Sequence, residues 1–124
     1  MYEWIKGSTY TAIATLNENN ITLNNSATSY FTDVRWVLLG IDQEEFKLAI
    51  KPVSRSDYDM HIYPLEDLHK ISVGNGYARI TNKNIMTIIS NLLGKPLNNN
   101  KYLASWDDQQ SMLVIDLKTE MGRN

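Results

Sequence analysis

Cysteine is absent from the 124-residue chain, which excludes disulfides, thiolate metal ligands and cysteine nucleophiles together. The absence also fits a reducing compartment. Long hydrophobic runs are absent too: 43% of the residues are hydrophobic, but no run approaches the roughly 18 residues of a membrane helix. The start, from Met1 to Lys6, lacks the basic-then-apolar layout of a secretory signal. We therefore expect a cytoplasmic protein with no membrane contact.

An excess of charge of one sign is also missing. The 12 Lys and Arg residues face 14 Asp and Glu residues, a formal charge of −2. The molecule as a whole is therefore not the basic body of an avid nucleic-acid binder, and any contact with DNA must come from a local patch.

Residues for catalysis are few. The chain has two histidines, and Ser26 and Ser29 have no His and acid partners at a readable spacing for a hydrolase triad. The turn Gly74-Asn75-Gly76 falls between expected strands, whereas a phosphate loop precedes a helix. We expect no enzymatic activity and no cofactor.

What the sequence does contain is a series of short alternating segments, in a chain of the length of one domain. In the first half, Asn24 or Asn25 can cap a short helix. The elements expected there are strands 10–16 and 21–23 around turn 17–20, helix 26–31, and strands 36–41 and 46–51 around the acidic turn 42–45.

The second half has the same order of elements. Thr81 or Asn82 can cap a clearer helix, which Gly94 ends. The elements expected are strands 69–73 and 77–80 around turn 74–76, helix 85–93, and strands 102–106 and 112–117 around turn 107–110. Between the halves, Pro64 favours a short helical turn in a polar connector.

The two halves align as repeats. Asp42 matches Asp107 at an offset of 107 − 42 = 65, and Asn19 matches Gly76 at 76 − 19 = 57. Shared alternation in two β-rich stretches is the alternative explanation, but the common order of elements favours duplication. We predict one domain over residues 1–124, of class α+β and mostly antiparallel β, with repeats at about 9–53 and 69–118 joined by a connector at 54–68.

The repeated unit resembles the AbrB/SpoVT swapped-hairpin family. The segments Ile21-Thr22-Leu23-Asn24-Asn25-Ser26-Ala27 and Ile80-Thr81-Asn82-Lys83-Asn84-Ile85 stand where that family has β residues, Ile-Pro and a short helix, with Asn in place of Pro. A tandem pair is similar to the MraZ arrangement. The resemblance implies an intramolecular pseudo-dimer and a non-catalytic, DNA-associated transcriptional regulator that acts as an oligomer. The arginines that flank the family's helix are absent from the first unit.

A DNA-binding surface needs cations gathered on one face to neutralise phosphates. The second half has Arg79 and Lys83 beside its helix, and Asn side chains there could contact bases or phosphates. An ordinary solvated face is the alternative. The candidate nucleic-acid-binding residues are Arg79, Lys83, Asn82, Asn84, Lys70, Arg35 and Lys6.

Two other functions stay open. Asp57, Asp59 and His61 alternate, so that in a strand they would share one side and could bind a divalent metal, although a charged connector also explains them. The runner-up function is a protein-interaction or scaffold module of the same fold. The partners considered are duplex DNA, a second copy of the chain and another protein; no metal is expected.

The alternation also predicts the core. It comprises Leu16, Ile21, Leu23, Phe31, Val37, Leu39, Leu48, Ile50, Ile71, Val73, Ile80, Ile85, Ile88, Ile89, Leu92, Leu103, Leu113 and Ile115.

Overall fold

The structure is a computed structural model that describes residue 1 and residues 11–121. The helical segments are α1 (Asn25–Thr28), α2 (Arg55–Asp59), α3 (Lys83–Leu93) and the 3-10 turns η2 (Ser29–Phe31) and η3 (Leu65–Asp67). The strands are β1 (Ile13–Leu16), β2 (Asn20–Leu23), β3 (Trp36–Asp42), β4 (Lys47–Val53), β5 (His69–Lys70), β6 (Ser72–Val73), β7 (Ala78–Thr81), β8 (Asn100–Asp107) and β9 (Met112–Glu120).

The strands form one sheet in the order β5-β3-β4-β9-β8-β1-β2-β7-β6. Each of its strand pairs is antiparallel. The two outermost strands, β5 and β6, are separated along the chain by Ile71 alone, whose backbone N–H donates to the carbonyl of Arg35 at 3.0 Å. The sheet therefore nearly closes on itself, which confirms the mostly antiparallel β class.

The core lies inside this sheet because every second residue of each strand points inward. Leu16, Ile21 and Ile80 stand opposite one another on β1, β2 and β7, and at most 1% of each is exposed. Burial of such a side chain stabilises a fold by about 1.5–3 kcal/mol. Alternate residues of the same strands face outward.

The two halves of the chain meet in four ladders, of β1 with β8, β2 with β7, β3 with β5 and β4 with β9. In the ladder of β4 with β9, Ala49 faces Val114, an offset of 114 − 49 = 65. In the ladder of β2 with β7, Thr22 faces Arg79, an offset of 79 − 22 = 57. These are the offsets at which the sequence of the first half aligns with that of the second.

The two acidic hairpin turns share one backbone conformation. Asp42 Oδ1 accepts from the backbone N–H groups of Glu44 and Glu45, at 3.1 and 3.0 Å. Asp107 Oδ1 accepts from those of residues 109 and 110, at 3.0 and 3.1 Å. Each turn ends in a left-handed residue, Phe46 (φ 52°) or Ser111 (φ 53°). Asp favours such turns because its short side chain bonds to its own backbone two residues on.

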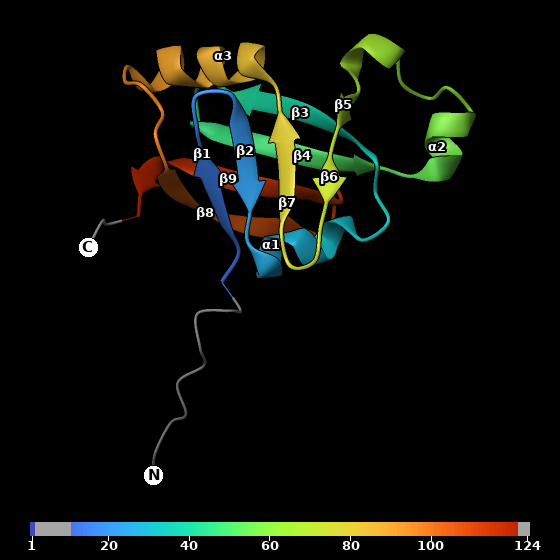
Figure 1. Cartoon of the computed structure of the whole chain (residues 1–124), viewed down its shortest axis with the longest axis horizontal. Coiled ribbons are helices and arrows are strands. Elements are labelled where there is room, and N and C mark those ends of the chain that lie inside the picture. Colours follow the sequence, from blue (N-terminus) through green and yellow to red (C-terminus); the bar gives the residue numbers. More distant parts are fainter. Residues whose placement is uncertain (2–10, 122–124) are drawn as a thin grey trace.

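The helices cover the two ends of the strands. Figure 1 shows α3 across one end of β1, β2 and β7, and α1 at the opposite end. Asn24 caps α1 and Asn82 caps α3, each through Oδ1 to the third backbone N–H, at 3.1 Å. Gly94 ends α3 with a φ of 69°, which a residue without Cβ adopts without strain.

Three predicted core residues are wrong. Val73, Ile88 and Leu103 are 39%, 41% and 49% exposed. Leu103 follows the inward-facing Tyr102 and therefore points outward. Because residues 102–104 are all apolar, the sequence does not show which of them face the core. Of the buried hydrophobic residues, the prediction missed Ala14, Ala27, Val53, Ala78, Met86, Leu97, Tyr102 and Leu117.

The alternation of Asp57, Asp59 and His61 is also misleading. Asp57 and Asp59 lie in α2, where residues two apart point about 200° apart, and His61 follows in a left-handed turn (φ 55°). The condition of a strand is therefore not met, and the three side chains do not share one side. Within residues 11–121, no group of three or more His, Cys, Asp or Glu residues is placed to hold a metal.

Candidate nucleic-acid interface

Arg79 lies in an outward-facing row of side chains on the sheet. It pairs in register with Thr22 of β2 and Ser72 of β6, and the row continues from Thr22 through Thr15 to Lys101 of β8. Ala78 and Ile80, the neighbours of Arg79 along β7, are buried, so the strand's alternation turns Arg79 to solvent. The row therefore carries two cations, three hydroxyls and no carboxylate.

A hydrogen bond brings Lys70 and Lys83 to the same region. Asn82 Oδ1 accepts from Ile85 N, which leaves its amide nitrogen to donate to His69 Nδ1 at 2.8 Å. Since His69 precedes Lys70 and Asn82 precedes Lys83, this contact joins β5 to the start of α3. Both lysines are exposed.

Arg35 lies in the same region, directly before the first residue of β3. Its carbonyl accepts from Ile71 N, and the next residue, Trp36, pairs in register with Lys70. We call the four exposed cations Arg35, Lys70, Arg79 and Lys83 the basic surface. They come from three parts of the chain and gather around Ile71.

None of the four forms an ion pair within residues 11–121. The ion pairs found there join Lys95 to Glu120 at 2.6 Å and Lys118 to Glu45 at 3.3 Å. Glu120 raises the pKa of the Lys95 ammonium, chiefly by accepting its hydrogen bond. Lys47, Lys51, Arg55 and Lys101 likewise form no ion pair among the described residues, so what distinguishes the basic surface is that its four cations lie near one another.

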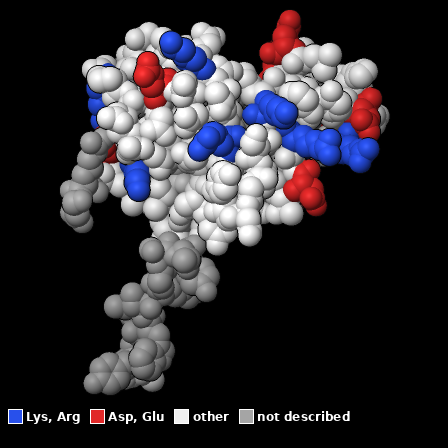
Figure 2. Space-filling view, in the orientation of Figure 1, with Lys and Arg blue, Asp and Glu red and all other residues white. Residues whose placement is uncertain are grey.

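The surroundings of the basic surface are mixed. Figure 2 shows Lys and Arg side chains following one another from the middle of the visible face toward the edge where α2 lies, with Asp and Glu on either side of that edge. Asp33 lies two residues before Arg35, and η3 carries Glu66 and Asp67. Positive charge is therefore concentrated on part of this face only.

The remaining candidate residues differ in their placement. Asn84 is exposed beside Lys83, whereas Asn82 is half-buried and its amide is engaged in the cap and with His69. Asn82 therefore positions Lys83 and Lys70. Lys6 lies outside the described residues. Lys101 was not among the candidates, because no pattern in the sequence reveals that β8 pairs with β1.

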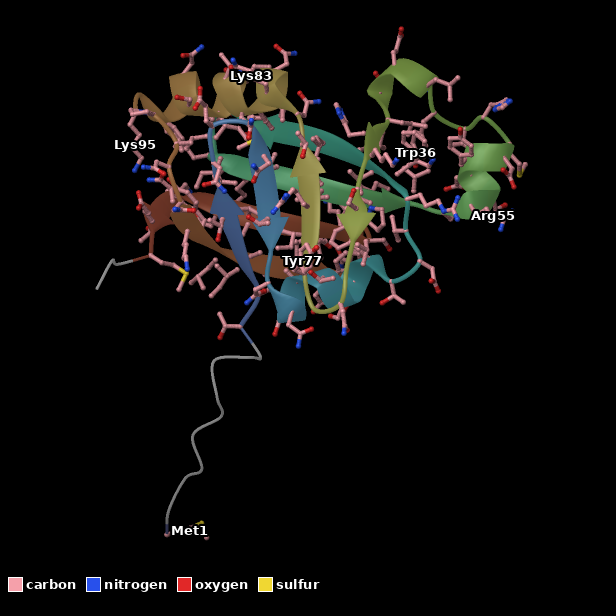
Figure 3. All side chains as sticks on the ribbon, in the orientation of Figure 1. Met1, Trp36, Arg55, Tyr77, Lys83 and Lys95 are labelled. Atoms are coloured by element: carbon pink, nitrogen blue, oxygen red, sulfur yellow. The ribbon has the colours of Figure 1, made fainter. Side chains whose placement is uncertain are left out.

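A groove borders the basic surface on the side of α2. Its volume is about 1310 Å³, and η2, β3, α2 and the turn between β6 and β7 supply its walls. Arg35 and Lys70 line it together with Arg55, the first residue of α2. Figure 3 shows Trp36 and Arg55 at this end of the molecule and Lys83 at the start of α3.

Comparison with known proteins identifies no relative. No protein-family model, no curated protein and no solved structure matches the chain. Among the helices of the described part of the chain, none has the length and apolar character needed to cross a membrane.

Proposed function

We propose that the protein is a non-catalytic, DNA-associated regulator that contacts duplex DNA through the basic surface. The observation that carries this proposal is the convergence of Arg35, Lys70, Arg79 and Lys83 without an ion pair among residues 11–121. Like charges repel one another, and an anionic partner relieves that repulsion. DNA phosphates are such a partner, and neutralising them releases counterions.

The outward row on the sheet supports the same function. Thr15, Thr22 and Ser72 offer hydroxyl donors beside Arg79, and hydroxyls and cations together make most protein contacts to the DNA backbone. The exposed Asn84 beside Lys83 adds an amide that can contact a base edge. Cytoplasmic localisation and a role in transcription belong to this proposal.

We also propose that the chain is an intramolecular pseudo-dimer of two swapped-hairpin units. Four pairs of features support it: the facing residues Ala49–Val114 and Thr22–Arg79, the Asp42 and Asp107 turns, the left-handed residues that end those turns, and the caps Asn24 and Asn82. When equivalent residues face each other in an antiparallel ladder, a local two-fold axis passes between them. This is the arrangement that the resemblance to the AbrB/SpoVT family implies.

Titration of labelled duplex DNA at 50 and 200 mM salt tests DNA binding. Four phosphate contacts give a salt slope of about −3.6, so affinity should fall roughly 100-fold between these salts. Arg79→Gln and Lys83→Gln should each reduce the steepness of the slope by about 1. Lys47→Gln is the matched control, because Lys47 is exposed on β4, away from the basic surface.

The same titration distinguishes DNA binding from the rival function, a protein-interaction module. Absence of binding at 50 mM salt, or binding that does not depend on salt, would refute the DNA proposal. A protein-interaction module is the second candidate, because the connector exposes Met60, Ile62 and Leu65, at 68%, 53% and 67%. Stable oligomers by light scattering with no affinity for DNA would favour that candidate.

A further inference from the structure

The groove beside α2 has the composition of a ligand site that is separate from the sheet face. We infer that it binds a nucleotide with two or more phosphates. The inference goes beyond the proposed DNA contact, although Arg35 and Lys70 border both sites. Arg55 and Tyr58 belong to the groove alone.

The groove is formed by segments that are far apart in the sequence. Trp36 pairs in register with Val53 on one side and with Lys70 on the other. Ser54 follows Val53 and caps α2 by accepting from Asp57 N at 3.0 Å. The cap places Arg55 and Tyr58 beside Trp36 and its two strand partners. The opposite wall consists of Asn25, Thr28, Ser29, Thr32 and Asp33 from α1, η2 and the following loop.

The charges that line the groove favour an anion that also carries hydrogen-bond donors. Three cations, Arg35, Arg55 and Lys70, stand against two carboxylates, Asp33 and Asp59, a net charge of 3 − 2 = +1. Within residues 11–121 no ion pair joins any of the five. Arg and Lys are the side chains that bind phosphate most strongly, whereas the carboxylates can accept from ribose hydroxyls or base amino groups.

An aromatic pair lines the same groove. The rings of Trp36 and Tyr58 stack with their centroids 5.5 Å apart and their planes within 4°. Both residues border the groove and are half-buried. A flat aromatic surface near cations suits a nucleobase, because stacking of a base on an aromatic ring contributes about 1–3 kcal/mol.

The size of the groove argues for a ligand larger than a single phosphate. Its volume of about 1310 Å³ is that of an open groove and leaves room for a ligand of nucleotide size. Inorganic phosphate would leave the aromatic pair and the carboxylates without a role. A nucleoside di- or triphosphate engages cations, carboxylates and rings together.

Calorimetric titration of the full chain tests the inference, with adenosine triphosphate, adenosine and tripolyphosphate as probes in the presence of a chelator. Adenosine triphosphate should bind at least tenfold more tightly than either part alone. Arg55→Gln should weaken its binding about tenfold, which corresponds to about 1.4 kcal/mol. Tyr58→Leu should lower the affinity for adenosine triphosphate but not that for tripolyphosphate. Tyr58→Phe, which keeps the ring, should retain the affinity for adenosine triphosphate. Lys47→Gln should leave all affinities unchanged.

Two outcomes would overturn the inference: tripolyphosphate that binds as tightly as the nucleotide, or nucleotide binding that Arg55→Gln leaves unchanged. Circular dichroism of each variant confirms that it folds. Failure here is distinguishable from failure of the DNA proposal, because Arg79→Gln and Lys83→Gln should alter only duplex binding and Arg55→Gln only nucleotide binding.

Discussion

At the scale of single residues, two asparagines do more than cap helices. The Oδ1 atom of Asn24 caps α1 while its Nδ2 donates to the carbonyl of Thr11 at 2.7 Å. The Oδ1 atom of Asn82 caps α3 while its Nδ2 donates to His69 Nδ1. Each amide thus ties a helix start to a neighbouring segment. At Asn82 the tie also sets the position of the basic surface, since Lys70 and Lys83 flank the bonded pair.

Replacement of Asn82 should therefore be costly. Asn82→Ala removes the cap, a loss of about 0.5–2 kcal/mol, and the bond to His69, a loss of about 0.5–1.5 kcal/mol. We expect a fall of about 1–3 kcal/mol in the free energy of unfolding, measured by urea denaturation. Asn84→Ala, at an exposed position two residues away, should change it by less than about 0.5 kcal/mol. Equal effects of the two substitutions would contradict the double role of Asn82.

At the scale of elements, α3 shows how a pattern can predict a helix and still misplace its buried face. The predicted range 85–93 agrees with the observed Lys83–Leu93, but the buried residues are Met86 and Ile89. Ile88 was expected inside and is 41% exposed. The helix has apolar residues over more than one face, so its orientation is set by the sheet end on which it lies.

Truncation of α3 at two neighbouring positions tests this orientation. Ile89 is fully buried, and Ile89→Ala should lower the free energy of unfolding by about 2–5 kcal/mol, because it leaves a cavity. Ile88→Ala, next to it, should cost less, about 1 kcal/mol, because 41% of Ile88 is already exposed to solvent and its truncation leaves no closed cavity. Thermal or urea unfolding measures both, and the reverse ranking would show that α3 packs on its other face.

At the scale of the whole molecule, neither half of the chain can close the sheet alone. The ladders of β2 with β7 and of β4 with β9 join residues from opposite sides of the connector, and so do β1 with β8 and β3 with β5. The core is built from both halves, and one half would expose it. Folding should therefore be a single cooperative event.

Division of the chain in its connector tests this dependence. A cut after Met60, which is 68% exposed, leaves fragments 1–60 and 61–124 that each lack partners for their inter-half strands. Each fragment alone should give the circular dichroism of an unfolded chain, and an equimolar mixture should regain the β spectrum of the intact protein. A fragment that folds as a monomer would refute the pseudo-dimer.

The order of elements could be derived from the sequence because it depends on local chemistry. The turns at Asp42 and Asp107, the caps Asn24 and Asn82 and the stop at Gly94 act within a few residues of themselves. The alignment of the two halves likewise needed only the order of residues. The two turns and the stop at Gly94 were predicted where the structure has them, and each cap is one of the two candidates that the sequence offered.

Only the tertiary structure decided which of these pieces meet. The pairing of β1 with β8, the outward phase of Leu103, the helical state of the Asp57 segment and the groove beside α2 depend on contacts between residues far apart in the chain. Lys70 and Lys83 were candidates by type, and a hydrogen bond between their neighbours brings them together. Local patterns specify turns and periodicity, whereas sheet order and surface charge follow from how the halves bury their apolar faces against each other.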